Sequence, residues 1–290
     1  MLNTVRSHIN KEMGGALFSQ PWRTMPGNQE TLRNLKSYQP KNEQVTHVRI
    51  LLHGPAGAGK SGFINSVDSV FQGRATGRAL TDSISGTSFT QKYATYKIRK
   101  DPESFCSFIF NDIMGFESSY GVHEEDIKLA LMGHVKDGYR FLSERRLVET
   151  DTGYNSDPTM DDRVHVLVSV VPVMSVSLLS EEIVKKMRAV RLAASDLGIP
   201  QVAILTKVDE ACPKVKGNIK NVYKSKYLKE QVEKFSMLLG LPVNCIFLVK
   251  NYSSEIQTND DCNAYILCAM NQIISLAEDS LDNPPNQPAC

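Results

Sequence analysis

A glycine-rich loop that follows an apolar run is the feature that most constrains the fold of this 290-residue chain. The stretch VTHVRILLHGPAGAGKSGFINSV contains the pattern G-x-x-x-x-G-K-[ST] at residues 54–61. The apolar residues at 45–53 predict a buried strand before the loop, and the periodic apolar residues at 60–72 predict a helix after it. This order predicts a phosphate-binding P-loop, and an ordinary glycine-rich turn is the alternative.

The chemistry of the loop suits a phosphate group. Its glycines let the backbone curl so that successive N–H groups point inward, and the positive end of the following helix adds to this anion-binding nest. We expect Lys60 to reach the β- and γ-phosphates of a nucleotide, and Ser61 to place its hydroxyl on Mg²⁺. The predicted phosphate-binding residues are Gly54, Pro55, Ala56, Gly57, Ala58, Gly59, Lys60, Ser61 and Gly62, with Gly115 from a second loop.

That second loop follows the strand-like run CSFIFND and reads D-x-x-G from Asp112 to Gly115. An aspartate at a strand end can hold Mg²⁺ through water, and the glycine can offer its N–H to a γ-phosphate. A loop threonine should complete the Mg²⁺ shell when a γ-phosphate is present. In LTDSISGTSFTQKY, Thr87 is the first choice and Thr90 the reserve, and the alternative is a polar loop with incidental threonines. The predicted metal ligands are Ser61, Asp112 and Thr87.

The motif TKVD at 206–209 follows the run QVAIL and fits the guanine-reading pattern [TN]-K-x-D. The Asp209 carboxylate would accept from N1–H and N2–H₂ of guanine, and the Lys207 stem would cover the purine face. The alternative is a helix-capping loop in which Asp209 is the cap. After the run CIFLV, a backbone N–H near residues 253–254 is expected to contact guanine O6. The predicted base-binding residues are Thr206, Lys207, Asp209, Ser253 and Ser254.

No catalytic residue is assigned. In Ras-like proteins a glutamine after D-x-x-G orients the attacking water, and Phe116 occupies that place here. Because a phenyl ring cannot accept a proton from water, slow GTP hydrolysis is expected. Glu117 and His123 are the alternative candidates for this role, and a partner that supplies a group in trans is the third alternative.

Alternation of strand-like and helix-like stretches predicts the rest of the fold. Repeated βα units indicate an α/β fold of the P-loop NTPase class, a Ras-like G domain with a mostly parallel central sheet flanked by helices. The segment 93–99 alternates from side to side, as an edge or antiparallel strand does. Strands are expected near 45–53, 92–99, 106–111, 164–171, 201–206 and 245–250, and helices near 60–72, 124–136, 177–197, 219–239 and 262–279.

The chain divides into three predicted parts. Residues 1–44 are polar and interrupted by prolines, which indicates a linker or strap; its PWR segment at 21–23 either pins the strap into a groove or is mobile. Residues 45–282 are the predicted guanine-nucleotide-binding domain, and 283–290 a disordered tail. An insertion at 117–162, between D-x-x-G and T-K-x-D, is expected to carry one helix and a surface loop.

Composition narrows the choice of partners. The 33 basic and 32 acidic residues nearly balance, which argues against a nucleic-acid partner. Six cysteines without a C-x-x-C pair indicate reduced thiols in a cytoplasmic protein rather than a zinc site or disulfides. The N-terminus lacks a signal-peptide core, and the most apolar run, 164–179, is too short to span a membrane. A lysine run without acids is either a solvated face or a docking patch for an anionic partner: Lys214, Lys216, Lys220, Lys224, Lys226 and Lys229.

The sequence resembles the interferon-induced protein 44 family, including its 44-like members. The resemblance covers about residues 20–282 and is carried by PWR, RILLHGPAGAGKSGFINSVDSVFQG, QKYATY, DDRVHV, VAILTKVD and NYSSE. It implies a cytoplasmic guanine-nucleotide-binding protein induced in antiviral responses. Many members carry an additional N-terminal domain, which a chain of this length is expected to lack.

Three functions compete at this point. The first is a GTP- or GDP-binding switch or scaffold with Mg²⁺ that changes a surface for an unidentified protein partner. The second is a GTP hydrolase activated by a partner or by nucleotide-dependent homodimers. The third is an interaction protein with a structural or vestigial P-loop. Intact nucleotide motifs argue against the third function, and Phe116 argues against fast hydrolysis.

Overall fold

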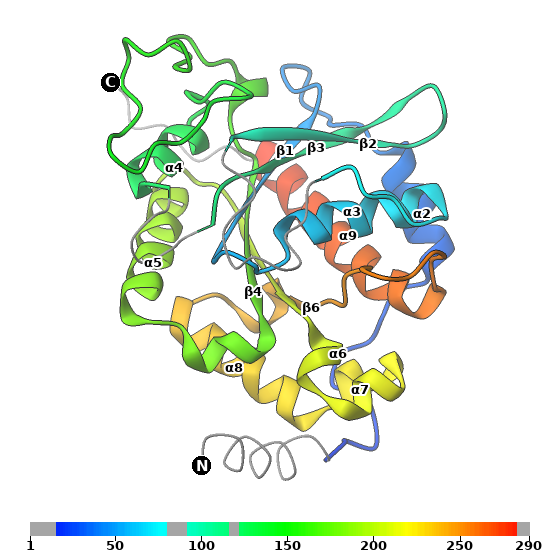
Figure 1. Cartoon of the computed structure of the whole chain (residues 1–290). Coiled ribbons are helices and arrows are strands. Elements are labelled where there is room, and N and C mark those ends of the chain that lie inside the picture. Colours follow the sequence, from blue (N-terminus) through cyan, green and yellow to red (C-terminus); the bar gives the residue numbers. More distant parts are fainter. Residues whose placement is uncertain (1–15, 80–91, 116–121, 283–290) are drawn as a thin grey trace.

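The computed structural model describes residues 16–79, 92–115 and 122–282. A six-stranded sheet with strand order β2-β3-β1-β4-β5-β6 forms its centre (Figure 1). β2 is antiparallel to β3, and all other neighbouring strands are parallel. The predicted α/β class with a mostly parallel sheet is confirmed, and each strand lies where it was expected. The strands are β1 (Val48–His53), β2 (Ala94–Arg99), β3 (Phe105–Asp112), β4 (Val166–Pro172), β5 (Gln201–Thr206) and β6 (Ile246–Leu248).

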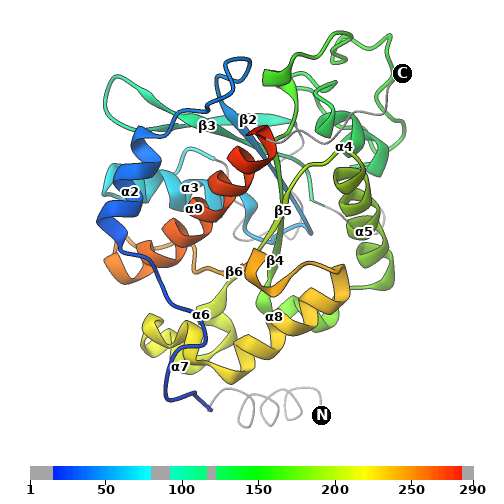
Figure 2. The same cartoon turned by 180° about the vertical axis from the view of Figure 1, so that it is seen from behind.

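Helices cover both faces of the sheet (Figures 1 and 2). One face carries α2 (Asn28–Ser37), α3 (Lys60–Gln72) and α9 (Asp260–Asp282), and the other carries α4 (Glu124–Leu131), α5 (Glu181–Asp196) and α8 (Lys226–Leu239). Short segments are α6 (Val208–Ala211), α7 (Pro213–Gly217), η1 (Met160–Asp162), η2 (Val173–Leu178), η3 (Ile219–Lys224) and η4 (Val243–Cys245). Within the described ranges, no helix has the length and apolar character needed to cross a membrane.

The two covered faces of the sheet explain why the central strands are mostly apolar. Successive side chains of a strand point to opposite faces, so a strand covered on both sides needs apolar residues at most positions. In β1, Ile50 and Leu52 belong to the core beneath α3 and α9, whereas Leu51 belongs to the core beneath α4, α5 and α8. Packing on both faces therefore fixes the ends of these strands, and the ends in turn fix where the following loops begin.

The N-terminal segment packs against the domain. The Trp22 ring meets the Tyr223 ring edge-on at 4.8 Å, and Arg23 donates to the carbonyl oxygens of Val243 and Ile246, both at 2.6 Å. The pinned alternative for PWR is therefore the one that the structure shows. Helix α2, which was not predicted, packs on α9 and buries only two of its side chains, Thr31 and Leu35, which is a weak periodic signal.

Side-chain caps set several helix ends that apolar periodicity did not predict correctly. The prediction of a single helix at 219–239 was wrong, because η3 ends before Ser225 and a new helix begins after it. The Ser225 hydroxyl accepts the Leu228 N–H at 3.2 Å and is the N-cap of α8. Helix α5 begins at Glu181 because Ser180 is its N-cap, and α4 ends near Gly133, which has a φ of 89°. The rest of the insertion, to residue 162, is irregular apart from isolated bridges and η1.

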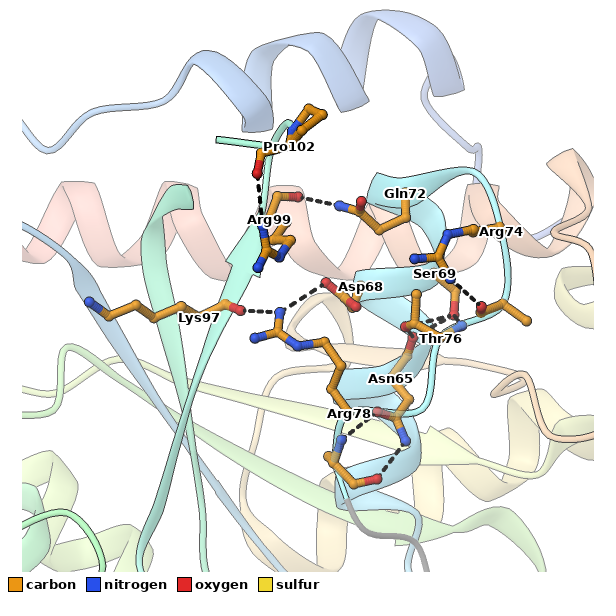
Figure 3. Close-up of polar contacts among 12 residues, drawn as sticks. Asn65, Asp68, Ser69, Gln72, Arg74, Thr76, Arg78, Lys97, Arg99 and Pro102 are labelled. Carbon is orange, nitrogen blue, oxygen red and sulfur yellow. Dashed lines mark hydrogen bonds and ion pairs between the residues drawn. The ribbon is translucent and has the colours of Figure 1, made fainter. Parts of the chain in front are cut away.

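A cluster of polar contacts attaches the segment after α3 to that helix (Figure 3). The Asn65 side chain donates to the Ala79 carbonyl oxygen and accepts the Ala79 N–H, both at 2.8 Å. Arg78 donates to the Lys97 carbonyl oxygen at 2.9 Å and lies 3.6 Å from the buried Asp68 carboxylate. These contacts join α3, the segment after it and β2.

Replacing Asn65 with alanine should therefore lower the free energy of unfolding by about 1–3 kcal/mol, since both buried polar groups of Ala79 lose their partner. Urea unfolding measures this change. The control is Asn34→Ala on the exposed face of α2, which should change stability little. Equal free energies of unfolding for the two variants would contradict the fastening role of Asn65.

Candidate functional site

The P-loop lies between β1 and α3, and two of its glycines are required by geometry. Gly54 has a φ of 143°, and a Cβ there would lie 2.1 Å from the Val170 carbonyl oxygen of β4. Gly59, with a φ of 92°, is the N-cap of α3 and brings no side chain to the N-terminus of the helix. The first turn of α3 thus keeps backbone N–H groups that can donate hydrogen bonds to an anion.

Lys60 and Ser61 are the first two residues of α3, directly after the P-loop. The Lys60 ammonium is 3.3 Å from the Gly54 carbonyl oxygen and 3.2 Å from that of Pro55, so it lies across the loop. Ser61 donates to the Asp112 carboxylate at 2.5 Å. Asp112 is buried at the end of β3, opposite Leu52 of β1. The structure therefore brings two of the predicted Mg²⁺ ligands together, whereas Thr87 and Thr90 lie outside the described residues.

The D-x-x-G loop touches the P-loop directly. A Cβ at Gly115 would lie 2.5 Å from the backbone nitrogen of Ala56, so only glycine allows this approach. Phe116 and Glu117 lie outside the described residues. His123 immediately precedes α4, and its Nε2 is 3.0 Å from the Ser143 carbonyl oxygen.

These groups fit a polyphosphate with Mg²⁺. No side chain caps the start of α3, and an ammonium lies across the loop that precedes this helix. A hydroxyl and a carboxylate meet beside it, and oxygen ligands are those that Mg²⁺ prefers. Burial and then the charge of Lys60 lower the pKa of His53, the last residue of β1, to about 3, so His53 stays neutral next to the loop.

The T-K-x-D segment is tied to the same loop. Thr206, at the end of β5, donates to the Ala58 carbonyl oxygen at 2.6 Å. Lys207 has a φ of 58° and is the one non-glycine residue with positive φ in the described part of the chain. That conformation costs roughly 1–2 kcal/mol, and such strain persists where surrounding contacts fix it, often at functional sites. Asp209 follows in the first turn of α6 and is partly exposed.

Asn251 is a site residue that the sequence analysis missed. Its amide donates to the Gly59 carbonyl oxygen at 3.0 Å, and a Cβ at Gly59 or Gly62 would lie 2.9 or 3.0 Å from that amide nitrogen. The next N–H, of Tyr252, donates to the Ser66 hydroxyl of α3 at 2.9 Å. The loop after β6 is therefore anchored on the P-loop and α3. The sequence signal is an asparagine three residues after the end of β6, which alone indicates only a turn.

The backbone donors of Ser253 and Ser254 have a partner within the chain. Their N–H groups donate to the Glu255 carboxylate at 2.9 and 3.1 Å, and the same carboxylate pairs with Lys250. Burial raises the pKa of Glu255, but the hydrogen bonds from Lys250 and the backbone outweigh burial and hold the pKa at about 2. The assignment of Ser253 or Ser254 to guanine O6 stays a prediction.

Half of the lysine run has local partners. Lys220 lies 3.3 Å from the Asp261 carboxylate, and the ammonium groups of Lys226 and Lys229 each lie 5.4 Å from the centre of the Phe18 ring. Phe18 belongs to the N-terminal segment, which forms a bridge between Leu17 and Ser225. Lys226 and Lys229 therefore help to hold that segment against the domain.

Comparison with known proteins finds relatives that align with most of this chain. No protein-family model matches it. Mouse interferon-induced protein 44 is 34% identical over 255 residues, which are 88% of this chain and 60% of that protein. Human interferon-induced protein 44-like is 32% identical over 258 residues, covering 88% of this chain and 57% of that protein. The chain is therefore similar over most of its length to interferon-induced protein 44 and its 44-like relative.

The resemblance predicted from the motifs is thereby confirmed, and the chain spans about three fifths of the length of these interferon-induced protein 44 relatives. Among solved structures, Toc33 from Arabidopsis thaliana in complex with GDP and Mg²⁺ matches with a TM-score of 0.46 and 14% identity, covering 87% of this chain and 92% of that one. A probable GTP-binding protein engB matches with a TM-score of 0.43 and 13% identity, covering 80% and 99%.

Proposed function

We propose that this protein binds GTP or GDP with Mg²⁺ and acts as a nucleotide-dependent switch or scaffold. The observation that carries the proposal is the convergence of four loops at the carboxyl edge of the sheet, where α/β proteins bind nucleotides. Three contacts join the other loops to the P-loop and the start of α3: Ser61 with Asp112, Thr206 with Ala58, and Asn251 with Gly59.

Each loop has a distinct proposed role. The P-loop N–H groups and Lys60 bind the phosphates, and Gly115 lets a further N–H approach them. Ser61 and Asp112 would hold Mg²⁺, which when bound offsets phosphate charge. Asp209 accepts from the guanine edge, and Lys207 covers the base, with Thr206 fixing the start of their loop.

The names of the relatives support placing this function in the interferon response. We propose an antiviral or innate-immune role in the cytoplasm, in which the bound nucleotide controls a surface for a protein partner. A nucleotide-dependent homodimer is the alternative arrangement, and it would make the protein a GTP hydrolase activated by its own partner copy.

Thermal unfolding with different nucleotides tests the proposal. A ligand at 100 times its Kd stabilises the folded state by about 2.7 kcal/mol, which is roughly 5–10 °C in a domain of this size. GTP and GDP with Mg²⁺ should raise the melting temperature by this amount, and ATP with Mg²⁺ should not. An equal rise with ATP would reject selectivity for guanine, and no rise with any nucleotide would reject nucleotide binding.

Intrinsic GTP hydrolysis is expected to be slow, because Phe116 stands where Ras-like proteins have a water-orienting glutamine. Ras itself turns over at only about 10⁻⁴–10⁻³ s⁻¹ unaided, and we expect a similar or lower rate. Single-turnover hydrolysis should be measured against protein concentration for wild type and Phe116→Gln. A rate that rises steeply with concentration would indicate dimer-supplied catalysis, and about 1 s⁻¹ at low concentration would overturn the prediction.

A further inference from the structure

The loop after β6 places a charged pair beside the T-K-x-D segment. β5 and β6 are parallel with Leu205 opposite Leu248, and the Val249 N–H donates to the Leu205 carbonyl oxygen at 2.9 Å. The pairing of the two strands ends there: two residues further along, Lys250 follows β6, and Lys207, where the backbone turns with a φ of 58°, follows β5 at the same carboxyl edge of the sheet. Lys250 pairs with Glu255, and their side chains are only 24% and 29% exposed.

Glu255 also occupies the backbone donors of this loop. Its carboxylate accepts the N–H groups of Ser253 and Ser254, the donors that would otherwise be expected to contact guanine O6. An ammonium has three N–H donors. Lys250 therefore keeps donors beyond the one that it gives to Glu255, whereas the two backbone groups are already used.

Resting on the proposed function, we infer that the Lys250 ammonium, oriented by Glu255, donates a hydrogen bond to O6 of the bound guanine. Lys250 is then a specificity-determining residue and Glu255 a positioning residue. Lys250 remains charged at neutral pH: burial lowers its pKa, but the hydrogen bond with Glu255 and the nearby negative charges, including that of Asp209, outweigh burial and raise it.

The two side chains read adjacent positions of the base with opposite charge. Asp209 accepts from N1–H and N2–H₂, and Lys250 donates to the neighbouring O6. Adenine carries an amino group at that position, so a donor would face a donor, and the ammonium would lose its partner. Such a mismatch at a site with buried polar groups discriminates strongly between bases.

The test combines a change in the protein, Lys250→Met, with a change in the nucleotide, 6-thio-GTP, in which a sulfur that is a poor acceptor replaces O6. Titration calorimetry gives the Kd of wild type and variant for GTP and for 6-thio-GTP. Lys250→Met should weaken GTP binding by about 10- to 100-fold and 6-thio-GTP binding far less. It should also narrow the preference for GTP over ATP. The control is Lys216→Met, an exposed lysine of α7, which should bind both nucleotides as wild type does.

Glu255→Gln distinguishes a hydrogen bond donated to guanine O6 by Lys250 from one donated by the backbone N–H of Ser253 or Ser254. It should weaken GTP binding by about 2- to 10-fold, because Lys250 loses its charged partner. Tighter binding would show that Glu255 competes with the base for the Ser253 and Ser254 donors, and would overturn the inference. If Lys250→Met lowered the affinity for GTP and for 6-thio-GTP by the same factor, the inference would also be overturned. If wild type binds neither GTP nor GDP, the proposed function itself fails.

Discussion

Lys60→Ala is expected to weaken GTP binding by about 10- to 150-fold, the value of a charged hydrogen-bonding partner of a phosphate. The ammonium lies across the P-loop, close to the carbonyl oxygens of Gly54 and Pro55, so it is already placed where a phosphate would meet it. Because the side chain is buried, its removal also leaves those carbonyl groups with one partner fewer.

Titration calorimetry with GTP and Mg²⁺ measures this loss. Lys185→Ala, an exposed lysine of α5, is the matched control and should bind as wild type does. The thermal midpoint without nucleotide should be recorded for both variants, so that a folding defect is recognised. A well-folded Lys60→Ala protein with unchanged GTP affinity would rule out the P-loop as the phosphate site.

Asp209→Asn should exchange guanine for xanthine as the preferred base. The carboxylate is proposed to accept two hydrogen bonds, from N1–H and N2–H₂, and an amide oxygen with its adjacent NH₂ cannot accept both. We expect GTP affinity to fall by about 100-fold or more, the sum of two charge-assisted bonds. Xanthosine triphosphate, which has an oxygen at C2, should gain affinity because the new amide can donate to it.

Competition binding with both triphosphates measures the exchange. The control is Glu210→Gln, which alters the exposed neighbouring carboxylate in the same short helix. Full GTP affinity in Asp209→Asn without gain for xanthosine triphosphate would show that Asp209 does not read the base. The capping alternative for Asp209 is already excluded, because Lys207 is the N-cap of α6 and Asp209 lies inside the helix.

The sequence predicted the sheet and the motif loops because those signals are local. Continuous apolar runs such as β1 and β4 are buried on both faces, and a P-loop needs glycines at fixed spacing between a strand and a helix. Helix ends were less predictable because single residues such as Ser180 and Ser225 set them through side-chain hydrogen bonds that apolar periodicity does not register.

The remainder of the site depends on contacts between distant residues. Asn251 reaches Gly59 across 192 positions, and Arg23 reaches Ile246 across 223, so neither contact has a local pattern. The contacts of Ser253, Ser254 and Lys250 with Glu255 are local, but no motif in the loop after β6 indicates them. Local motifs thus predict which loops form the site, whereas the hydrogen-bond partners of individual loop residues become known only from the folded structure.

The nucleotide retained by the purified protein tests the central claim most directly. The protein should be purified with Mg²⁺ in the buffer and denatured, and the released nucleotides should be separated by ion-exchange chromatography and identified by mass. Guanine-nucleotide binding predicts GDP or GTP, and any protein that emerges empty should take up GTP on titration. Release of an adenine nucleotide, or empty protein that takes up no GTP, would contradict the claim.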